Sequence, residues 1–295
     1  MEFVDQQTDC EVSVTLLTRN AGALFERVLD ALRMQETARR VELVVVDTES
    51  TDGTVESIEG CGGHVIGIAQ NEFDFGSTRD KAFECARGEI MISLSQDSIP
   101  AKPTWLENLI RPLEDPQVAV ASGSSIPDPD RPYPQFAWEK NGYFYFTQEM
   151  KKFVARYGKG VSFSNAAIRR TAWEALRIDP QPQAEDFQFQ TKLYVAGLET
   201  AFPTDAPVLH HHNYTLRQLY RRCRNEGLAS RHLGIPYTEL DLLRDLAGPK
   251  KYIQWARELK RGSLNGPAAA LFPMLRPIAV YTGARLARGY RDHMR

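Results

Sequence analysis

Acidic side chains stand at three places in this sequence where a carboxylate could do chemistry. Asp47 follows the apolar run at residues 41–46, and Asp97 follows the alternating segment at residues 89–95. The pair Glu185-Asp186 directly precedes a helical pattern. A carboxylate can accept hydrogen bonds from a ring N–H or a ribose hydroxyl, hold a divalent cation, or act as a general base. The three positions therefore offer candidates for all three kinds of chemistry.

Each of these acids also has a plain structural interpretation. The segment at residues 47–54, DTESTDGT, consists largely of residues that form turns and cap helices. Asp97 precedes Pro100 and suits a capped turn, and acids such as Glu185 and Asp186 complement the dipole of a helix that begins beside them. Taken one at a time, the motifs leave both interpretations open.

Three consecutive histidines, His210, His211 and His212, add a second kind of candidate ligand. Neutral imidazole is a common metal ligand. In a strand, His210 and His212 would point to one face and His211 to the other. An exposed loop fits the cluster equally well. We predict that His212, slightly ahead of His210, binds a metal ion together with Asp97.

The elements that must position these side chains alternate along the first third of the chain. Strands are predicted near residues 12–17, 41–46, 64–68 and 89–95, and helices near residues 24–32, from 52 onward, and at 77–86. Strands that alternate with helices form a mainly parallel sheet, and ligands bind beyond the carboxyl ends of its strands. We therefore expect the polar residues that follow the strands to converge on one crevice: Thr18, Arg19, Asn20, Asp47 and Asp97.

Four ordered segments carry a resemblance to a known family: VSVTLLTRN, VELVVVDTESTDGT, FDFGSTRDKAFECARGE and ISLSQDSIP. In this order they resemble family 2 glycosyltransferases of the GT-A fold, and FDFGSTR and SQDSIP resemble bacterial rhamnosyltransferases. The similarity covers residues 12–227. It implies a Rossmann-like, mainly parallel nucleotide-binding sheet fused to an acceptor subregion, which is an α/β architecture. The residue pattern from 216 onward predicts a helical C-terminal extension.

The resemblance also implies roles for individual residues. Asp47 would contact the base or ribose, with Thr18 and Asn20 in the same pocket. Asp97 would ligate Mg²⁺ or Mn²⁺, although Gln96 and Ser98 flank it where the family usually has a second acid. The remaining assignments are Gln96 and Arg79 at the donor, with Arg79 neutralising the diphosphate; Asp186 as the general base; and Asn165, Arg169 and Glu185 at the acceptor or sugar.

The overall composition narrows the possible classes of protein but does not identify the function. The chain has 295 residues and a net charge of −2, so nothing in its charge suggests a nucleic-acid partner. Its four cysteines are scattered without a CxxC pair, which favours reduced thiols and a cytoplasmic location. The acidic, polar start is unlike a signal peptide. Residues 268–287 contain two prolines and two arginines and are expected not to span a membrane.

A change in sequence composition and pattern divides the chain into a catalytic domain at residues 1–215 and a helical extension at residues 216–295. The nucleotide half is placed at about residues 10–125 and the acceptor half at about 126–215, where a proline-rich loop and an aromatic stretch follow residue 126. Residues 249–295 hold ten Lys or Arg against two acids. This basic segment could contact the inner face of an anionic membrane, or simply pack on the catalytic domain as an amphipathic helix.

These observations predict an inverting glycosyltransferase that acts in cell-surface polysaccharide synthesis. The donor best suggested by the resemblance is dTDP-rhamnose, and the acceptor is a hydroxyl of a glycan or a lipid-linked molecule. A UDP-hexose-dependent enzyme and a catalytically silent nucleotide-binding protein are the alternatives. A nucleotidyltransferase is disfavoured, because the segment TRNAGALFER after the first strand lacks the glycine-rich basic loop that such an enzyme would carry.

Overall fold

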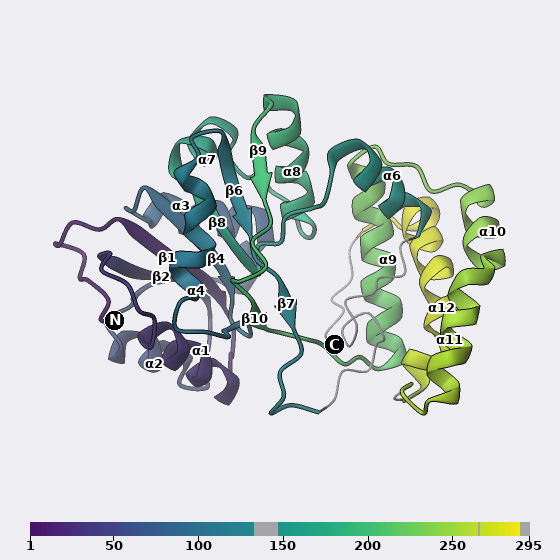
Figure 1. Ribbon diagram of the computed structural model, residues 1–295, viewed down its shortest axis with the longest axis horizontal. Helices are drawn as coiled ribbons and strands as arrows, with labels where there is room; N and C mark the ends of the chain where they lie inside the picture. The colour runs from purple at the N-terminus through teal and green to yellow at the C-terminus, as the bar shows by residue number, and fades with distance from the viewer. Residues whose placement is uncertain (133–146, 265, 290–295) are drawn as a thin grey trace. The chain divides into compact units, whose positions relative to one another are not determined.

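The computed structural model describes residues 1–132, 147–264 and 266–289 (Figure 1). Contacts divide the chain into two compact units: the first comprises Met1–Ser125 and Gly160–His210, and the second comprises Ile126–Lys159 and His211–Arg295. The aromatic stretch at residues 136–146 lies outside the described residues. The domains predicted from the sequence, residues 1–215 and 216–295, have other boundaries than these two units, and they stay a prediction.

The first unit is built on a seven-stranded sheet in the order β3-β2-β1-β4-β8-β6-β9. Neighbouring pairs are parallel except where β8 takes part, so β8 alone is reversed. The strands are β1 (Val12–Thr18), β2 (Val41–Thr48), β3 (His64–Ile68), β4 (Ile90–Ser95), β6 (Val118–Ser122), β8 (Asn165–Arg169) and β9 (Glu199–Ala201). The mainly parallel α/β sheet predicted from the sequence is confirmed.

Helices cover both faces of this sheet (Figure 1). On one face, Val12, Val14 and Leu16 of β1 pack with Phe25 and Leu29 of α1. The helix predicted near residues 24–32 is confirmed. The helices of the unit are α1 (Ala23–Arg33), α2 (Thr54–Gly60), α3 (Phe75–Cys85), α4 (Trp105–Ile110), α7 (Arg170–Leu176) and α8 (Glu185–Ala196), with short 3₁₀ turns η1 (Gln70–Glu72) and η2 (Arg111–Glu114).

On the opposite face, α3, α7 and α8 pack against β4, β6 and β8. Phe83 of α3 contacts Trp173 and Phe163 edge to face, and Phe189 of α8 joins the same cluster. On α8, Phe189, Gln190 and Leu193 are buried, whereas Tyr194 and Val195 are exposed.

Two short strands of the first unit form the edge of a second, small sheet. β5 (Ile99–Pro100) pairs antiparallel with β10 (Val208–Leu209), and Leu209 lies opposite Ile99. A further short strand, β7 (Ser125–Ile126), belongs to this sheet. The pairing matters because β5 follows Asp97 closely and β10 ends directly before His210.

The second unit is helical, as predicted for the C-terminal region. Its helices are α6 (Gln148–Tyr157), α9 (Leu216–His232), α10 (Glu239–Ala247), α11 (Pro249–Lys260), α12 (Gly266–Tyr281) and the π-helical turn η3 (Thr282–Leu286). α9 approaches α12 and η3 closely at two glycines. A Cβ at Gly227 would lie 2.0 Å from the Val280 carbonyl, and one at Gly283 would lie 1.8 Å from the Arg224 carbonyl.

Candidate active site

The ends of β1 and β2 are joined through the Asp47 carboxylate. Thr18 lies opposite Asp47 in the strand register, and its Oγ1 donates a hydrogen bond to Asp47 Oδ2 at 2.7 Å. The same oxygen accepts from Ser50 Oγ at 2.6 Å, while Asp47 Oδ1 accepts from the Ser50 backbone N–H at 2.9 Å. Asp47 is therefore buried and organises the turn that begins α2. Its predicted contact with a base or ribose stays a prediction. The carboxylate has further lone pairs with which it could accept a hydrogen bond from such a ligand.

Asn20 and Gln96 connect the same turns to each other. Asn20 lies in the left-handed backbone region at φ 44°, which Asn tolerates better than most residues. Its side-chain oxygen accepts from the Thr51 N–H at 2.8 Å. Gln96 Oε1 accepts from the Arg19 N–H at 2.9 Å. The turns after β1, β2 and β4 thus form one cross-linked rim, as expected for the carboxyl edge of a parallel sheet.

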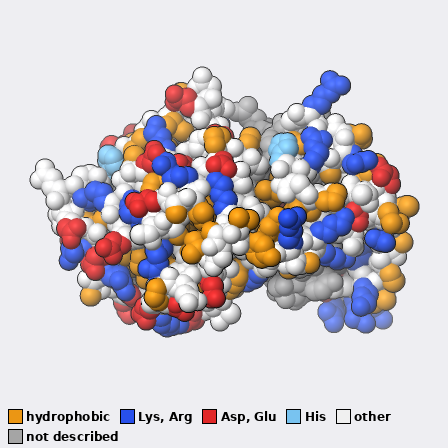
Figure 2. All heavy atoms as spheres, turned by 90° about the horizontal axis from the view of Figure 1, so that it is seen from above, with side chains coloured by type: hydrophobic (Ala, Val, Ile, Leu, Met, Phe, Trp, Pro, Cys, Tyr) orange, Lys and Arg blue, Asp and Glu red, His pale blue; other side chains and the backbone are white. Residues whose placement is uncertain are grey.

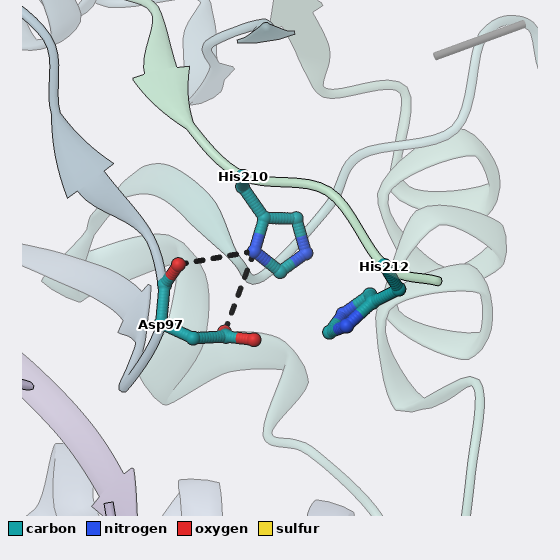
Figure 3. Close-up of side chains that lie close together, drawn as sticks. All are labelled: Asp97, His210 and His212. Atoms are coloured by element: carbon teal, nitrogen blue, oxygen red, sulfur yellow. Dashed lines mark hydrogen bonds and ion pairs between the residues drawn. The ribbon is translucent and has the colours of Figure 1, made fainter. Parts of the chain in front are cut away.

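Asp97 and His210 meet because β5 and β10 pair (Figure 3). His210 Nδ1 lies 3.4 Å from Asp97 Oδ1 and 3.3 Å from the Asp97 carbonyl oxygen. The Ser98 hydroxyl is also 3.3 Å from this nitrogen. Both side chains are only partly exposed, at 16% for His210 and 27% for Asp97. A carboxylate and an imidazole therefore share one protected position beyond the end of β4.

His211 points away from that position, as strand alternation predicted. It is buried in the second unit, where its Nδ1 accepts from the Asp128 N–H at 3.2 Å and its Nε2 lies 3.0 Å from the Pro132 carbonyl oxygen. This arrangement requires the ring proton on Nε2. Both ring nitrogens are engaged, which makes His211 a structural residue.

His212 follows His210 by two residues and begins the second unit together with His211. Two residues of chain span at most about 7 Å, so His212 stays within reach of His210 through the chain itself. Asp97, His210 and His212 each offer one ligand atom and make up a group of possible metal ligands among the described residues (Figure 3). The predicted ligand His212 thus stays a prediction, and His210 is the histidine that contacts Asp97.

This ligand set fits a divalent cation of a particular kind. Mg²⁺ binds oxygen ligands almost exclusively, whereas an imidazole suits softer divalent ions. One carboxylate with one or two imidazoles therefore favours Mn²⁺ over Mg²⁺. In this group of candidate ligands, a histidine and not a second acid lies beside Asp97.

A buried ion pair lies at the start of α8. Arg79 Nη2 and Nε donate to Glu185 Oε1 at 3.1 and 3.3 Å, and Nη1 donates to Ser93 Oγ at 2.5 Å. The guanidinium also lies over the Phe163 ring, 5.1 Å from its centroid. Arg79 is therefore occupied by protein groups in this structure. Its predicted contact with a diphosphate stays a prediction, and its observed partner is the acid next to Asp186.

Asp186 is the candidate base, and its environment favours the protonated form. Burial, followed by the neighbouring charge of Glu185, raises the pKa of Asp186 to about 7, although the Phe187 N–H and Arg79 act in the opposite direction. The position of Asp186 at a helix N-terminus would by itself lower the pKa of this acid, so the sequence does not indicate that burial raises it. A base whose pKa lies near neutrality suits proton abstraction at physiological pH.

The backbone before Asp186 is strained. Ala184 lies in the left-handed region at φ 66°, which costs a non-glycine residue about 1 kcal/mol or more. Nothing in the sequence signals this conformation. It sets the position of Glu185 and Asp186 as the first residues of α8.

Asn165 and Arg169, which were predicted to contact a sugar, both bond to protein groups in this structure, and their predicted contacts stay predictions. Asn165 is fully buried, and its amide accepts from Trp105 Nε1 and donates to the Ser124 and Ala206 carbonyls, so both of its side-chain N–H groups are used. Arg169 pairs with Ile90 at the amino end of β4, because β8 is antiparallel. It therefore lies at the edge opposite the rim and donates to the carbonyls of Leu113 and Asp115.

Comparisons with known proteins agree with this geometry. The model of the family "Glycosyl transferase family 2" matches residues 13–177. An O-antigen chain rhamnosyltransferase of Salmonella typhimurium is 31% identical over 78% of this chain and 75% of its own length, and one of Salmonella anatum is 32% identical over 73% and 71%.

Solved structures show the same fold. A mannosyltransferase from Pyrobaculum calidifontis, in complex with GDP-Man and Mn²⁺, matches with a TM-score of 0.65 at 19% identity, over 97% of this chain and 90% of that one. Glucosyl-3-phosphoglycerate synthase from Mycobacterium tuberculosis, in complex with Mn²⁺, UDP-glucose and phosphoglyceric acid, matches with a TM-score of 0.59 at 20% identity, over 78% and 81%.

Proposed function

The chain belongs to glycosyl transferase family 2, and on that premise we propose that it transfers rhamnose from dTDP-rhamnose to a hydroxyl group, with inversion at the anomeric carbon. The observation that carries the proposal is the rim at the carboxyl edge of the sheet. There Thr18, Asp47 and Asp97 lie at the carboxyl ends of three neighbouring parallel strands, and His210 contacts Asp97. Such an edge is where an α/β sheet binds a nucleotide.

The choice of donor and acceptor rests on the Salmonella relatives, whose names describe rhamnosyl transfer to O-antigen chains. We infer that this chain acts on a growing cell-surface polysaccharide, as a free or lipid-linked glycan. A UDP-hexose donor is the alternative within the same chemistry. All four cysteines are free thiols, which supports a reducing, cytoplasmic setting.

The residues of this chain would perform two tasks in the reaction, nucleotide binding and removal of the acceptor proton. Thr18, Asn20, Asp47 and Gln96 line the rim and would hold the nucleotide. Asp186 would take the proton of the acceptor hydroxyl while that oxygen forms a bond to the anomeric carbon. The bond from this carbon to the diphosphate breaks with its electron pair going to the phosphate oxygen, and Asp186 returns its proton to solvent.

A divalent cation fits the same scheme. Asp97 with His210, and His212 beside them, would hold it, and its charge would stabilise the diphosphate that leaves. Arg79 would hold Glu185 in place and thereby position the start of α8, where Asp186 lies.

Nucleotide binding and transfer test the proposal directly. Thermal unfolding of the purified chain would be followed with dTDP, UDP and GDP, each with Mn²⁺, Mg²⁺ or EDTA, because a ligand that binds only the folded state raises its stability. We expect dTDP with Mn²⁺ to raise the melting temperature most, and radiolabelled dTDP-rhamnose to be consumed. A preference for UDP with UDP-hexose turnover would replace the rhamnose assignment. Binding without turnover of any donor would indicate a silent nucleotide-binding protein.

A further inference from the structure

Three helices of the second unit expose several large apolar side chains and bury three of their four acidic ones. Of the 14 exposed large hydrophobic residues in the described chain, eight lie on or beside α10, α11 and α12. They are Leu240, Leu243, Ile253, Leu259, Leu271, Met274, Ile278 and Leu286. We call them the apolar set. A water-soluble surface helix ordinarily shows the opposite pattern.

α10 shows the inversion most clearly. Its acids Asp241 and Asp245 are buried, while Leu243 is 62% exposed. Asp241 accepts from Lys152 Nζ at 2.6 Å and from the Thr238 hydroxyl at 2.9 Å. Asp245 accepts from Tyr237 OH at 2.7 Å. The acids thus have partners inside the unit, and the helix orientation is fixed with its leucines outward.

α12 is held in its orientation by contacts from α11. Pro277 has no backbone N–H, so the carbonyl of Pro273, four residues earlier, lacks its usual helical donor. Lys251 Nζ donates to that carbonyl at 2.7 Å, and Trp255 Nε1 donates to the Ala270 carbonyl at 2.8 Å. Arg276 is buried on the other side and contacts Glu226. Met274 and Ile278 are left at the surface.

The charges exposed on and beside these helices are almost all positive. In residues 239–289 three of the four acids are buried, and Glu239 is the exposed one. Seven basic residues there are exposed: Arg244, Lys250, Arg257, Lys260, Arg261, Arg285 and Arg288. On the face of the second unit that Figure 2 shows, orange and blue side chains are more evident than red ones. The surface therefore combines apolar and positive groups.

From this combination we propose that α10, α11 and α12 bind the surface of a membrane that contains anionic phospholipid. Leucine, isoleucine and methionine side chains would enter the boundary of the acyl chains while Lys and Arg contact the head groups. A second copy of this chain is a poorer occupant, because a symmetric interface would place the seven cations against one another. No described helix has the length and apolar character to cross a membrane, so the contact would be peripheral.

Flotation with lipid vesicles tests the proposal without any sugar donor, so its result is separate from the test of catalysis. The full chain would be mixed with vesicles of phosphatidylcholine alone or with about one third phosphatidylglycerol. We expect binding to the anionic vesicles that weakens as salt rises. Leu243→Glu combined with Ile278→Glu should lower binding at least tenfold, and Lys260→Gln about fivefold.

Matched variants in the first unit separate this surface from a general effect of charge. Met34 is 67% exposed there and Lys102 is exposed, so Met34→Glu and Lys102→Gln should bind vesicles as the parent does. Circular dichroism would establish that each variant is folded. The proposal is overturned if the parent ignores anionic vesicles or if the α10 and α12 variants bind them unchanged. It is also overturned if size-exclusion chromatography shows a dimer that Leu243→Glu dissociates.

Discussion

At the scale of single residues, the proposed chemistry depends most on the ionisation of Asp186. Its carboxylate is at the start of α8, beside Glu185, and burial with the Glu185 charge raises its pKa to about 7. Only the ionised form can accept a proton from a hydroxyl. The environment therefore couples transfer activity to pH in the physiological range.

Removing this carboxylate should abolish most of the activity. We expect Asp186→Asn to lower kcat about 10²- to 10⁴-fold, because it removes the general base while keeping the side-chain shape. In the parent, kcat should rise with pH through a midpoint near 7 as Asp186 loses its proton, and the variant should lack this rise. Glu174→Gln, an exposed change on α7, serves as the control. Full activity of Asp186→Asn would remove Asp186 from the mechanism.

Glu185 offers a finer test of the same pair. Its negative charge raises the pKa of Asp186, so Glu185→Gln should move the midpoint of the pH–rate profile below that of the parent. The amide can still accept a hydrogen bond from Arg79, which limits the disturbance of α8. The measurement is kcat from pH 5 to 9 for both proteins. A midpoint that stays in place or rises would show that Glu185 does not set the ionisation of Asp186.

At the scale of elements, short strand pairings and close helix contacts decide where the important groups lie. β5 and β10 each contain two residues, yet their pairing brings Asp97 to His210 across more than a hundred positions of sequence. The turns after β1, β2 and β4 are likewise joined by side chains such as Asp47 and Gln96.

The β5–β10 pairing predicts that His210 takes part in metal binding. His210→Ala should weaken the stabilisation by Mn²⁺ with nucleotide about 10- to 100-fold in apparent affinity, since it removes an imidazole next to Asp97. Metal titrations followed by thermal unfolding would measure this. His211→Asn is not a neutral comparison, because His211 is buried and bonded on both nitrogens; His64→Ala, on β3, is the matched control. Equal Mn²⁺ affinity in His210→Ala and the parent would exclude His210 as a ligand.

The close approach of α9 to α12 gives a prediction for stability. A methyl group at Gly227 would meet the Val280 carbonyl at 2.0 Å, so Gly227→Ala must push the two helices apart. We expect a loss of about 1–3 kcal/mol in the free energy of unfolding, measured by urea denaturation. Gly60→Ala, where a Cβ would meet nothing within 4 Å, should cost far less. Similar stability of the two variants would contradict the observed helix contact.

At the scale of the whole molecule, charged groups buried in the second unit make stability depend on pH. Burial raises the pKa of Glu149 to about 6 from 4.5, against the opposing effects of Arg276 and Thr147. The folded chain therefore binds more protons than the unfolded chain between these values, and the contribution of Glu149 to stability falls as pH rises through that window. A shift of this size corresponds to about 2 kcal/mol.

Replacing Glu149 should remove this penalty. We expect Glu149→Gln to gain about 2 kcal/mol relative to the parent on going from pH 4.5 to pH 7.5, because Gln carries no charge at either pH. Urea denaturation of both proteins at the two pH values gives the difference, in which other titrating groups such as Asp186 cancel. An equal change with pH in the two proteins would show that the Glu149 carboxyl is not held protonated by its surroundings.

The sequence by itself determined the first unit's sheet and most of the rim. Apolar runs of β-branched residues fixed the strands, and the polar residues after them had to meet because parallel strands end at one edge. That reasoning placed Thr18, Asn20, Asp47 and Asp97 correctly relative to their strands, and it identified the helix that begins at Glu185.

Only the tertiary structure decided which of the candidate side chains are placed where they could contact a ligand. The reversed direction of β8 carried Arg169 to the opposite edge and buried Asn165, and no local pattern reveals the direction of a strand. The pairing of β5 with β10 selected His210 as the partner of Asp97. Burial raised the pKa of Asp186, and the inward turn of Asp241 and Asp245 left leucines at the surface of α10. Each of these outcomes depends on contacts between residues far apart in the chain, which periodicity and composition do not encode.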